Sequence, residues 1–255
     1  MRRLACWLAL AFAFALPAGA LDAPRLLDDE TAVARVLATV DARLALMSQV
    51  AAAKWLAGNA VSDPAREQAV LEHNATAASA LGLATTPAGE LLALQMRFAR
   101  EAQLRLHAKW QRHGCDACEP VPDLATVRQE LDALGATQLR AIHLAAPALA
   151  APDFVVRHTA LADERLQIAL PAGADRAALL HALAAIRRTA APSLARVQAS
   201  GVLRIATTGD YAPFSLERDG RLQGVDIALA LALAADLGLE AVFVPTGWPT
   251  LMQDL

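Results

Sequence analysis

The amino-acid sequence predicts a mainly all-α helical bundle followed by a short α/β segment. Three observations lead to this fold class. The 255 residues are 56% hydrophobic but only 4% aromatic, with alanine and leucine dominating, a composition typical of helices that bury a core. Apolar residues recur at helical spacing over most of the chain. After Gly201 the pattern changes to short strand-like runs on either side of one helix.

The first 20 residues have the features of a secretory signal. MRRLACWLALAFAFALPAGA has a basic start, an apolar run and small residues at its end, so we predict cleavage after Ala20. The apolar run is too short to span a bilayer. The mature protein is therefore expected to be periplasmic or secreted, without a membrane partner. The net charge of −3 gives no basic field for nucleic acid.

Four long helices are predicted first, from their apolar stripes and from the capping and stop residues that flank them. Asp63 and Asp123 are the expected caps of the second and fourth helices. The expected helices run from Asp28 to about Ala57, from Asp63 to Gly82, from Thr86 to the loop at Gly114, and from Asp123 onward. Residues 153–171 fit either a helix or a loop, and a further helix begins at Asp175.

The last part of the chain predicts a βαβ unit of a parallel sheet. A strand at Val202, a helix ending near Gly238 and the strand-like run AVFVP follow one another. One such unit cannot close a core alone. We therefore expect the start of a larger, truncated domain. The predicted organisation is a signal peptide (1–20), a helical domain (21–197) and a truncated segment (198–255).

Two cysteines remain after signal cleavage, Cys115 and Cys118 in HGCDACEP. In an oxidising compartment a C-x-x-C pair favours a small disulfide that tightens a loop. Half of a metal site and a redox dithiol are the alternatives. No second C-x-x-C accompanies the pair.

Arg43 and Lys54 lie at the two ends of RLALMSQVAAAKW, an otherwise mostly apolar helical run. They are eleven residues apart, about three turns, so on a regular helix both point the same way to within roughly 20°. Buried cations are costly unless something pairs with them. The stretch predicts either a shared anion or two side chains that reach solvent.

Three polar residues on other predicted helices can join this pair. Arg66 lies in the first turn of the second helix, where the helix dipole disfavours a cation. Arg128 lies one step from the apolar stripe of the fourth helix, and Gln103 lies on the third. Each arginine alone is typical of a solvated or carboxylate-paired side chain, as Arg66 can be with Asp63 or Glu67. As a set, three arginines and a lysine suit a small di-anion.

An ordered series of motifs connects these residues. R-x10-K-x11-R covers Arg43, Lys54 and Arg66, AKW surrounds the lysine, and D-x-x-RE begins at Asp63. QMRFAREAQ ends at Gln103, and DLATVRQELDALG surrounds Arg128. The series resembles the exported, all-helical chorismate mutases, well over residues 28–145 and loosely over 146–195.

The resemblance implies the conversion of chorismate to prephenate, in aromatic amino-acid biosynthesis, by a Claisen rearrangement with no covalent intermediate, no metal and no cofactor. Its partner is a small dicarboxylate, chorismate, and the family makes a homodimer a possible assembly. Arginines hold the carboxylates, Lys54 and Gln103 stabilise charge on the ether oxygen, and two acids orient an arginine and the substrate hydroxyl. The implied catalytic residues are Arg43, Lys54, Arg66, Gln103 and Arg128, and the implied substrate-binding positions are Asp63, Glu67 and Ala99.

Two features depart from that family. Ala99 stands where relatives carry a Ser or Thr hydroxyl that faces a substrate carboxylate. Exported relatives can also carry a disulfide late in the helical domain, whereas no cysteine follows Cys118 in this chain.

The C-terminal segment resembles the opening of periplasmic solute-binding proteins, in TTGDYAPFS, GVDIALALALAADLG and GWPTLMQDL. The exported cyclohexadienyl dehydratases, which convert prephenate to phenylpyruvate on that fold, are the most similar group. Asp210, Tyr211 and Asp226 match family positions. The segment lacks most of both lobes and any later catalytic carboxylate, so dehydratase activity is not predicted.

Two other functions compete with a mutase. One is a solute-binding protein or dehydratase fragment whose helical region is an accessory; it gives no reason for four cations to gather around one pocket. The other is a helical interaction module, which predicts that Arg43 and Lys54 face solvent or carboxylate neighbours.

Overall fold

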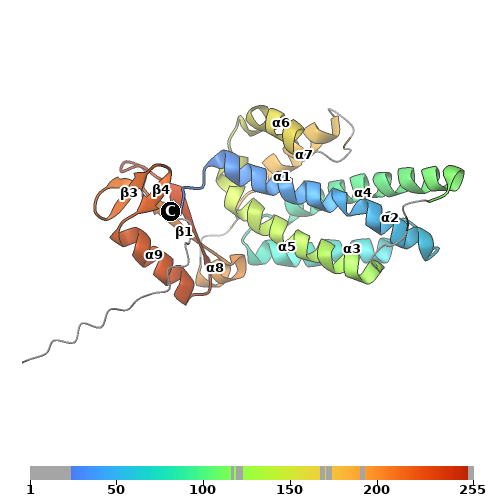
Figure 1. The fold of residues 1–255 in the computed structure, drawn as a ribbon, viewed down its shortest axis with the longest axis horizontal. Helices are drawn as coiled ribbons and strands as arrows, with labels where there is room; N and C mark the ends of the chain where they lie inside the picture. The colour runs from blue at the N-terminus through green and yellow to red at the C-terminus, as the bar shows by residue number, and fades with distance from the viewer. Residues whose placement is uncertain are drawn as a thin grey trace, which may run out of the picture.

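The computed structural model describes residues 24–115, 118, 123–166, 170, 174–189 and 193–251. The predicted signal peptide lies outside the described residues. Long helices form an elongated bundle, and a small α/β part lies at one end of it (Figure 1). The helical bundle and the parallel α/β element confirm the predicted fold class.

The helical part begins with α1 and α2, which follow one another almost as a single helix. The helices described in this part are α1 (Asp29–Ala45), α2 (Met47–Leu56), α3 (Pro64–Ala80), α4 (Thr85–His113), α5 (Leu124–Leu149), α6 (Phe154–Arg165), α7 (Ala174–Ala185) and α8 (Leu194–Ser200). The single first helix predicted from the sequence is thus interrupted by a turn at Leu46. Residues 153–171, which fitted either a helix or a loop, contain α6. The helix α8 was not predicted.

Three of these helices begin at an aspartate that caps them. The carboxylates of Asp28, Asp63 and Asp123 each accept a hydrogen bond from the backbone N–H three residues further on. Such a bond satisfies one of the free N–H groups at a helix start. The caps predicted at Asp63 and Asp123 are confirmed, and the first of them decides where Arg66 and Glu67 lie.

The core of the bundle forms where α1 packs against α5. Val33, Val36, Leu37 and Val40 of α1 are completely buried. Within the described residues, Asp29–Leu56 is the stretch with the length and hydropathy of a membrane-spanning helix, and 61% of its apolar window is buried inside the protein. Its hydrophobicity therefore belongs to the core of the bundle.

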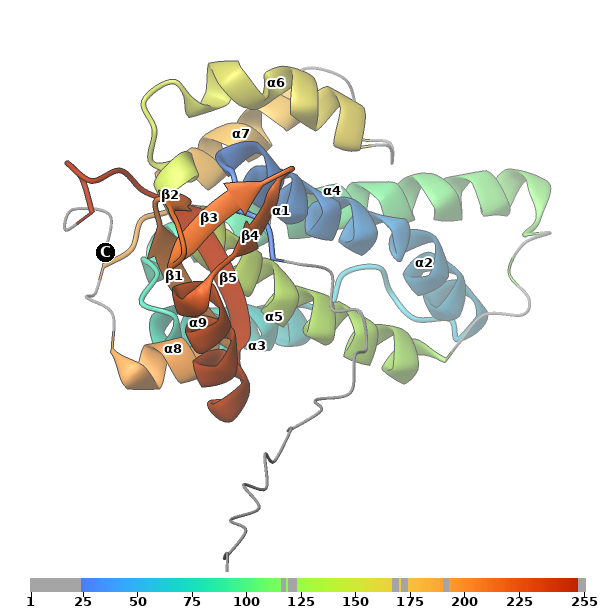
Figure 2. The ribbon, with the colours of Figure 1, turned by 60° about the vertical axis from the view of Figure 1, so that its left-hand side comes forward.

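The α/β part contains the predicted βαβ unit. Its elements are β1 (Val202–Thr207), β2 (Asp210–Tyr211), β3 (Ser215–Arg218), β4 (Arg221–Gln223), α9 (Val225–Asp236) and β5 (Glu240–Pro245). Strands β1 and β5 pair in parallel, with Val202 opposite Glu240. The antiparallel β2–β3–β4 sheet lies between them in sequence and was not predicted (Figure 2).

The segment before α1 adds to this α/β part. The Leu27 N–H donates to the Phe243 carbonyl at 2.7 Å, and Leu26 forms a parallel bridge with Phe243. The Leu222 N–H donates to the Pro24 carbonyl at 2.7 Å. The start of the described chain therefore covers the β5 edge of the two-stranded sheet, which the sequence pattern did not predict.

The apolar core continues from the bundle into the sheet. Val202 and Val242 belong to the same buried cluster as the α1 and α5 side chains. Arg35 of α1 lies 3.9 Å from the carboxylate of Glu240. The domain boundary predicted at residues 197–198 falls inside α8 and stays a prediction.

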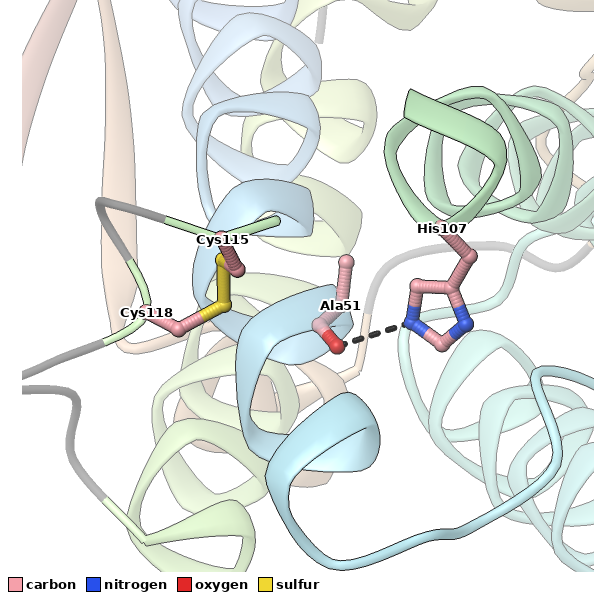
Figure 3. The surroundings of a disulfide bond; sticks show 4 residues. All are labelled: Ala51, His107, Cys115 and Cys118. Atoms are coloured by element: carbon pink, nitrogen blue, oxygen red, sulfur yellow. Dashed lines mark hydrogen bonds between the residues drawn. A yellow bond between two sulfur atoms is a disulfide. The ribbon is translucent and has the colours of Figure 1, made fainter. Parts of the chain in front are cut away.

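Cys115 and Cys118 form a disulfide, as the sequence favours. The bond packs beside α2, where Cys118 is buried together with Ala51 and Trp110 (Figure 3). On the other side of α2, a ring nitrogen of His107 lies 2.9 Å from the Ala51 carbonyl oxygen. The disulfide therefore secures the end of the bundle that carries α2.

We expect loss of this disulfide to lower the free energy of unfolding by about 2 kcal/mol or less, because the sequence separation is only 3 and the closed loop is short. Urea unfolding of the Cys115→Ser, Cys118→Ser protein, followed by tryptophan fluorescence, measures the loss. Reductant should reproduce it in the native chain and have no effect on the double variant. A loss above about 4 kcal/mol would contradict a role limited to closing the loop.

Candidate active site

One cavity of about 180 Å³ opens between α1, α2, α3, α4 and α5. All eight residues singled out from the sequence line it: Arg43, Lys54, Asp63, Arg66, Glu67, Ala99, Gln103 and Arg128. They come from five helices and from the cap of α3. The structure thus brings the whole set together around one space.

Lys54 reaches the cavity from the last turn of α2 and is only 8% exposed. Its Nζ donates to the Val61 carbonyl oxygen at 2.5 Å. Burial lowers the pKa of Lys54, the charge of Arg128 lowers it further, and Asp63 and Glu67 oppose the shift. An ammonium group has three donors, so two remain for a ligand.

Arg43 reaches the cavity from the last turn of α1. Its Nη1 donates to the Leu131 carbonyl oxygen on α5 at 3.0 Å. Burial lowers the pKa of Arg43, and the charge of Asp132 opposes this. The contact to a neutral carbonyl orients the guanidinium without neutralising it, so its charge remains available to the cavity.

Three other cations around the cavity form ion pairs. Arg66 Nη2 lies 3.1 and 2.9 Å from the two carboxylate oxygens of Asp132, not beside Asp63 or Glu67 as the sequence allowed. Arg128 Nη2 donates to Asp63 at 3.1 Å. All these side chains are partly exposed, and such pairs contribute about 0–1 kcal/mol each. A ligand carboxylate can therefore compete for the guanidinium groups.

The third pair joins Arg100 to Glu67, with Nη2 2.6 Å from the carboxylate. Arg100 follows Ala99 directly on α4 and also lines the cavity. It therefore supplies a donor next to the position where the family's hydroxyl is missing.

Gln103 lies on α4 and is 6% exposed. Its Nε2 lies 3.5 Å from the sulfur of Met47, a weak acceptor, and its Oε1 has no hydrogen-bond partner. Buried amides are normally fully hydrogen-bonded. This amide is thus free to bind a polar group inside the cavity.

Sequence reasoning missed six polar residues that line the cavity: His73, Asn74, Gln95, Arg100, Asp132 and Gln138. Asp132 lies four residues after Arg128, so helical spacing alone could have placed it on the same face. Arg100 lies three residues before Gln103, so helical spacing could also have placed these two residues on one face of α4. Gln95 and Gln138 form a buried hydrogen bond of 3.2 Å across α4 and α5, a contact between helices that spacing cannot reveal.

The charges around the cavity do not balance. Five cations and three carboxylates line it, which leaves two positive charges in surplus. The whole chain has a net charge of −3. The surplus of positive charge is therefore local, and it is equal and opposite to the charge of a dicarboxylate.

Solved structures of chorismate mutases match the helical part. The chain is 30% identical to the chorismate mutase from Burkholderia thailandensis, with a TM-score of 0.51, covering 60% of this chain and 96% of that one. The helical part belongs to the chorismate mutase family. The enzyme from Burkholderia phymatum is 26% identical, with a TM-score of 0.51 over 64% of this chain and 99% of that one. The secreted chorismate mutase from Yersinia pestis, at 21% identity and a TM-score of 0.54, shares the fold over 60% of this chain and 97% of its own.

The C-terminal segment matches a different group. Residues 203–255 match the sequence-family model of the bacterial extracellular solute-binding proteins, family 3. A cyclohexadienyl dehydratase from Pseudomonas aeruginosa is 46% identical over 84 residues, 30% of this chain and 31% of that protein. The L-cystine-binding protein TcyJ from Escherichia coli is 38% identical over 63 residues, 24% of each chain. The chain thus spans about a third or less of the length of these curated relatives.

Proposed function

We propose that the protein is an exported chorismate mutase that rearranges chorismate to prephenate. The observation that carries this proposal is the convergence of five cations on one cavity with two positive charges in surplus. A helical interaction module would leave Arg43 and Lys54 facing solvent or carboxylates, whereas both donate to backbone carbonyls. An accessory bundle would have no use for a surplus of positive charge around a cavity.

The arginines bind the two carboxylates of the substrate. The Leu131 carbonyl orients Arg43, and Arg66 and Arg128 exchange part of their contact with Asp132 and Asp63 for contacts with the ligand. Guanidinium groups bind carboxylates with two parallel hydrogen bonds, which fixes orientation as well as position. Held at both carboxylates, chorismate is kept folded, with the carbon atoms that will bond close together.

Lys54 and Gln103 act on the ether oxygen. As the C–O bond breaks and a C–C bond forms, negative charge grows on that oxygen. The reaction is an isomerisation, so no proton, electron or other atom is exchanged with the protein. The Lys54 ammonium and the Gln103 amide stabilise the growing charge by hydrogen bonds that are already positioned in the folded protein.

The direct test adds the full chain to chorismate and follows the loss of its absorbance, with prephenate identified as product. We expect turnover in the presence of a chelator and without added cofactor. No turnover by a folded, pure protein would reject the proposal.

We expect kcat/KM to fall on the alkaline side, because Lys54 must be protonated to stabilise the ether oxygen. Burial lowers its pKa below the ordinary 10.5, so the active form persists below that lowered pKa and is lost as the pH rises through it. Since kcat/KM reports the free enzyme, the fall should begin below pH 10.5. In the complex the substrate's charge raises the pKa of Lys54, so kcat should fall at a higher pH. Lys54→Arg, which does not titrate in this range, should lose the alkaline limb.

A second candidate function rests on the α/β part. A cavity of about 200 Å³ there is lined by residues that include Tyr211, Asp226 and Trp248. Aromatic rings around a carboxylate suit an amino-acid-like ligand. Calorimetric titration of the full chain with L-cystine and with prephenate tests it. Binding lost in Asp226→Asn but kept in Lys54→Ala would assign a ligand to this part, and no binding would reject it.

A further inference from the structure

Three basic side chains meet where the bundle joins the sheet. His143 lies on α5, Arg188 lies in the segment between α7 and α8, and Arg204 lies on β1. Arg188 Nη2 donates to the backbone carbonyl of His143 at 2.6 Å. The Arg188 backbone is itself held by a bridge to Leu83. The charge of Arg204 acts on both His143 and Arg188, so three separate elements bring these side chains near one another. None of the three residues lines the candidate active site.

Within the described residues, no carboxylate neutralises the positive charges of Arg188 and Arg204. The Nε atoms of Arg188 and Arg204 and the Nδ1 atom of His143 are buried and have no hydrogen-bond partner. Within the described residues, neither arginine forms an ion pair with a carboxylate. Unpaired cations in a partly buried position are costly. At the candidate active site, by contrast, Arg66, Arg100 and Arg128 each have a carboxylate partner.

The pKa of each of the three groups is lowered, first by burial, and neighbouring cations add to the shift for His143 and Arg188. Burial and the charges of Arg188 and Arg204 lower the pKa of His143 to about 4, although the Leu81 backbone opposes this. Burial and the charge of Arg204 lower the pKa of Arg188 to about 10. Burial lowers the pKa of Arg204 as well. A bound anion would oppose each of these shifts, because it favours the charged form of each group.

We propose that His143, Arg188 and Arg204 form a binding site for a small oxyanion, a carboxylate or a phosphate, at the junction between the bundle and β1. Two guanidinium groups provide forked donors that match either anion, and the imidazole adds a further donor when it is protonated. Because Arg204 belongs to the sheet and the other two residues belong to the helical part, the bound anion links the two. Its binding therefore stabilises the folded chain.

The test measures thermal unfolding of the full chain at constant ionic strength, with phosphate and acetate titrated in separate arms. We expect a saturable rise in Tm of a few degrees with at least one of them, and the stronger arm identifies the anion class. Arg188→Gln and Arg204→Gln should abolish the rise. Arg218→Gln, which removes an exposed arginine on β3, should retain it. Lys54→Ala should also retain it, which separates this site from the active-site cations.

A second measurement needs no arginine variant. NMR titration of the native chain should show the pKa of His143 rising by at least one unit when the anion is bound, with the signal assigned by its loss in His143→Gln. The other histidines serve as internal references. An unchanged His143 pKa, a rise in Tm that does not saturate, or a rise that survives in both Arg188→Gln and Arg204→Gln would overturn the site. A rise lost only in Lys54→Ala would assign the anion to the mutase cavity instead.

Discussion

Replacing Lys54 with alanine is expected to lower kcat for chorismate by roughly 100- to 1000-fold or more. The ammonium group is buried at the cavity and has two free donors. In the proposed mechanism it acts where negative charge grows during the reaction. That mechanism makes its interaction stronger in the transition state than with bound substrate. The loss should therefore fall on kcat more than on KM.

The matched control is Lys109→Ala, which removes the other lysine of the chain from an exposed position on the same bundle. Its turnover should equal that of the native protein. Helix content, measured by circular dichroism, should be the same in both variants. A folded Lys54→Ala protein with native turnover would remove Lys54 from the mechanism and with it the main support for the assignment.

Replacing Gln103 with glutamate is expected to make the reaction dependent on acid. A neutral amide donates a hydrogen bond at any pH, whereas a carboxyl group donates only when protonated. In its ionised form the introduced side chain would place a negative charge beside the ether oxygen, and kcat/KM should fall roughly 100- to 1000-fold at pH 8. Burial raises the pKa of a carboxyl group at such a site, so activity should return as the pH falls towards about 5.

Two further proteins sharpen this experiment. The native chain should show little change over the same acid range, because its amide does not titrate. Gln103→Leu, which cannot donate at any pH, should be impaired throughout. Equal impairment of Gln103→Glu at pH 5 and pH 8 would show that the side chain at this position does not donate to the reacting oxygen.

The ion pairs around the cavity affect how readily its arginines bind a ligand carboxylate. Asp132 holds Arg66 and Asp63 holds Arg128 in the ligand-free protein, so the guanidinium groups are kept ordered at the cavity wall. Ordered donors lose less conformational entropy when they bind. The acids thus keep the arginines in position while their weak, partly exposed contacts leave them able to bind a carboxylate.

Local chemistry explains what the sequence predicted well. Helix starts at Asp63 and Asp123 depend on a bond between neighbouring residues, and the eleven-residue spacing of Arg43 and Lys54 survives because α1 and α2 are nearly continuous. The turn at Leu46, the helix α8 and the small antiparallel sheet carry no strong periodic signal. Each of them is too short for a period to be read from its sequence.

The sequence by itself determined the helical bundle and the βαβ unit, because spacing, caps and turn residues act over a few positions of the chain. The eight residues that line the cavity were named from the resemblance of the ordered motifs to a known family. Only the tertiary structure decided which acid pairs with which arginine and that Arg100 and Asp132 line the cavity. It alone also placed residues 24–27 on the sheet and left Arg188 and Arg204 without a carboxylate. These features join helices and strands far apart in sequence, and their energies depend on distance and burial, which no local pattern contains.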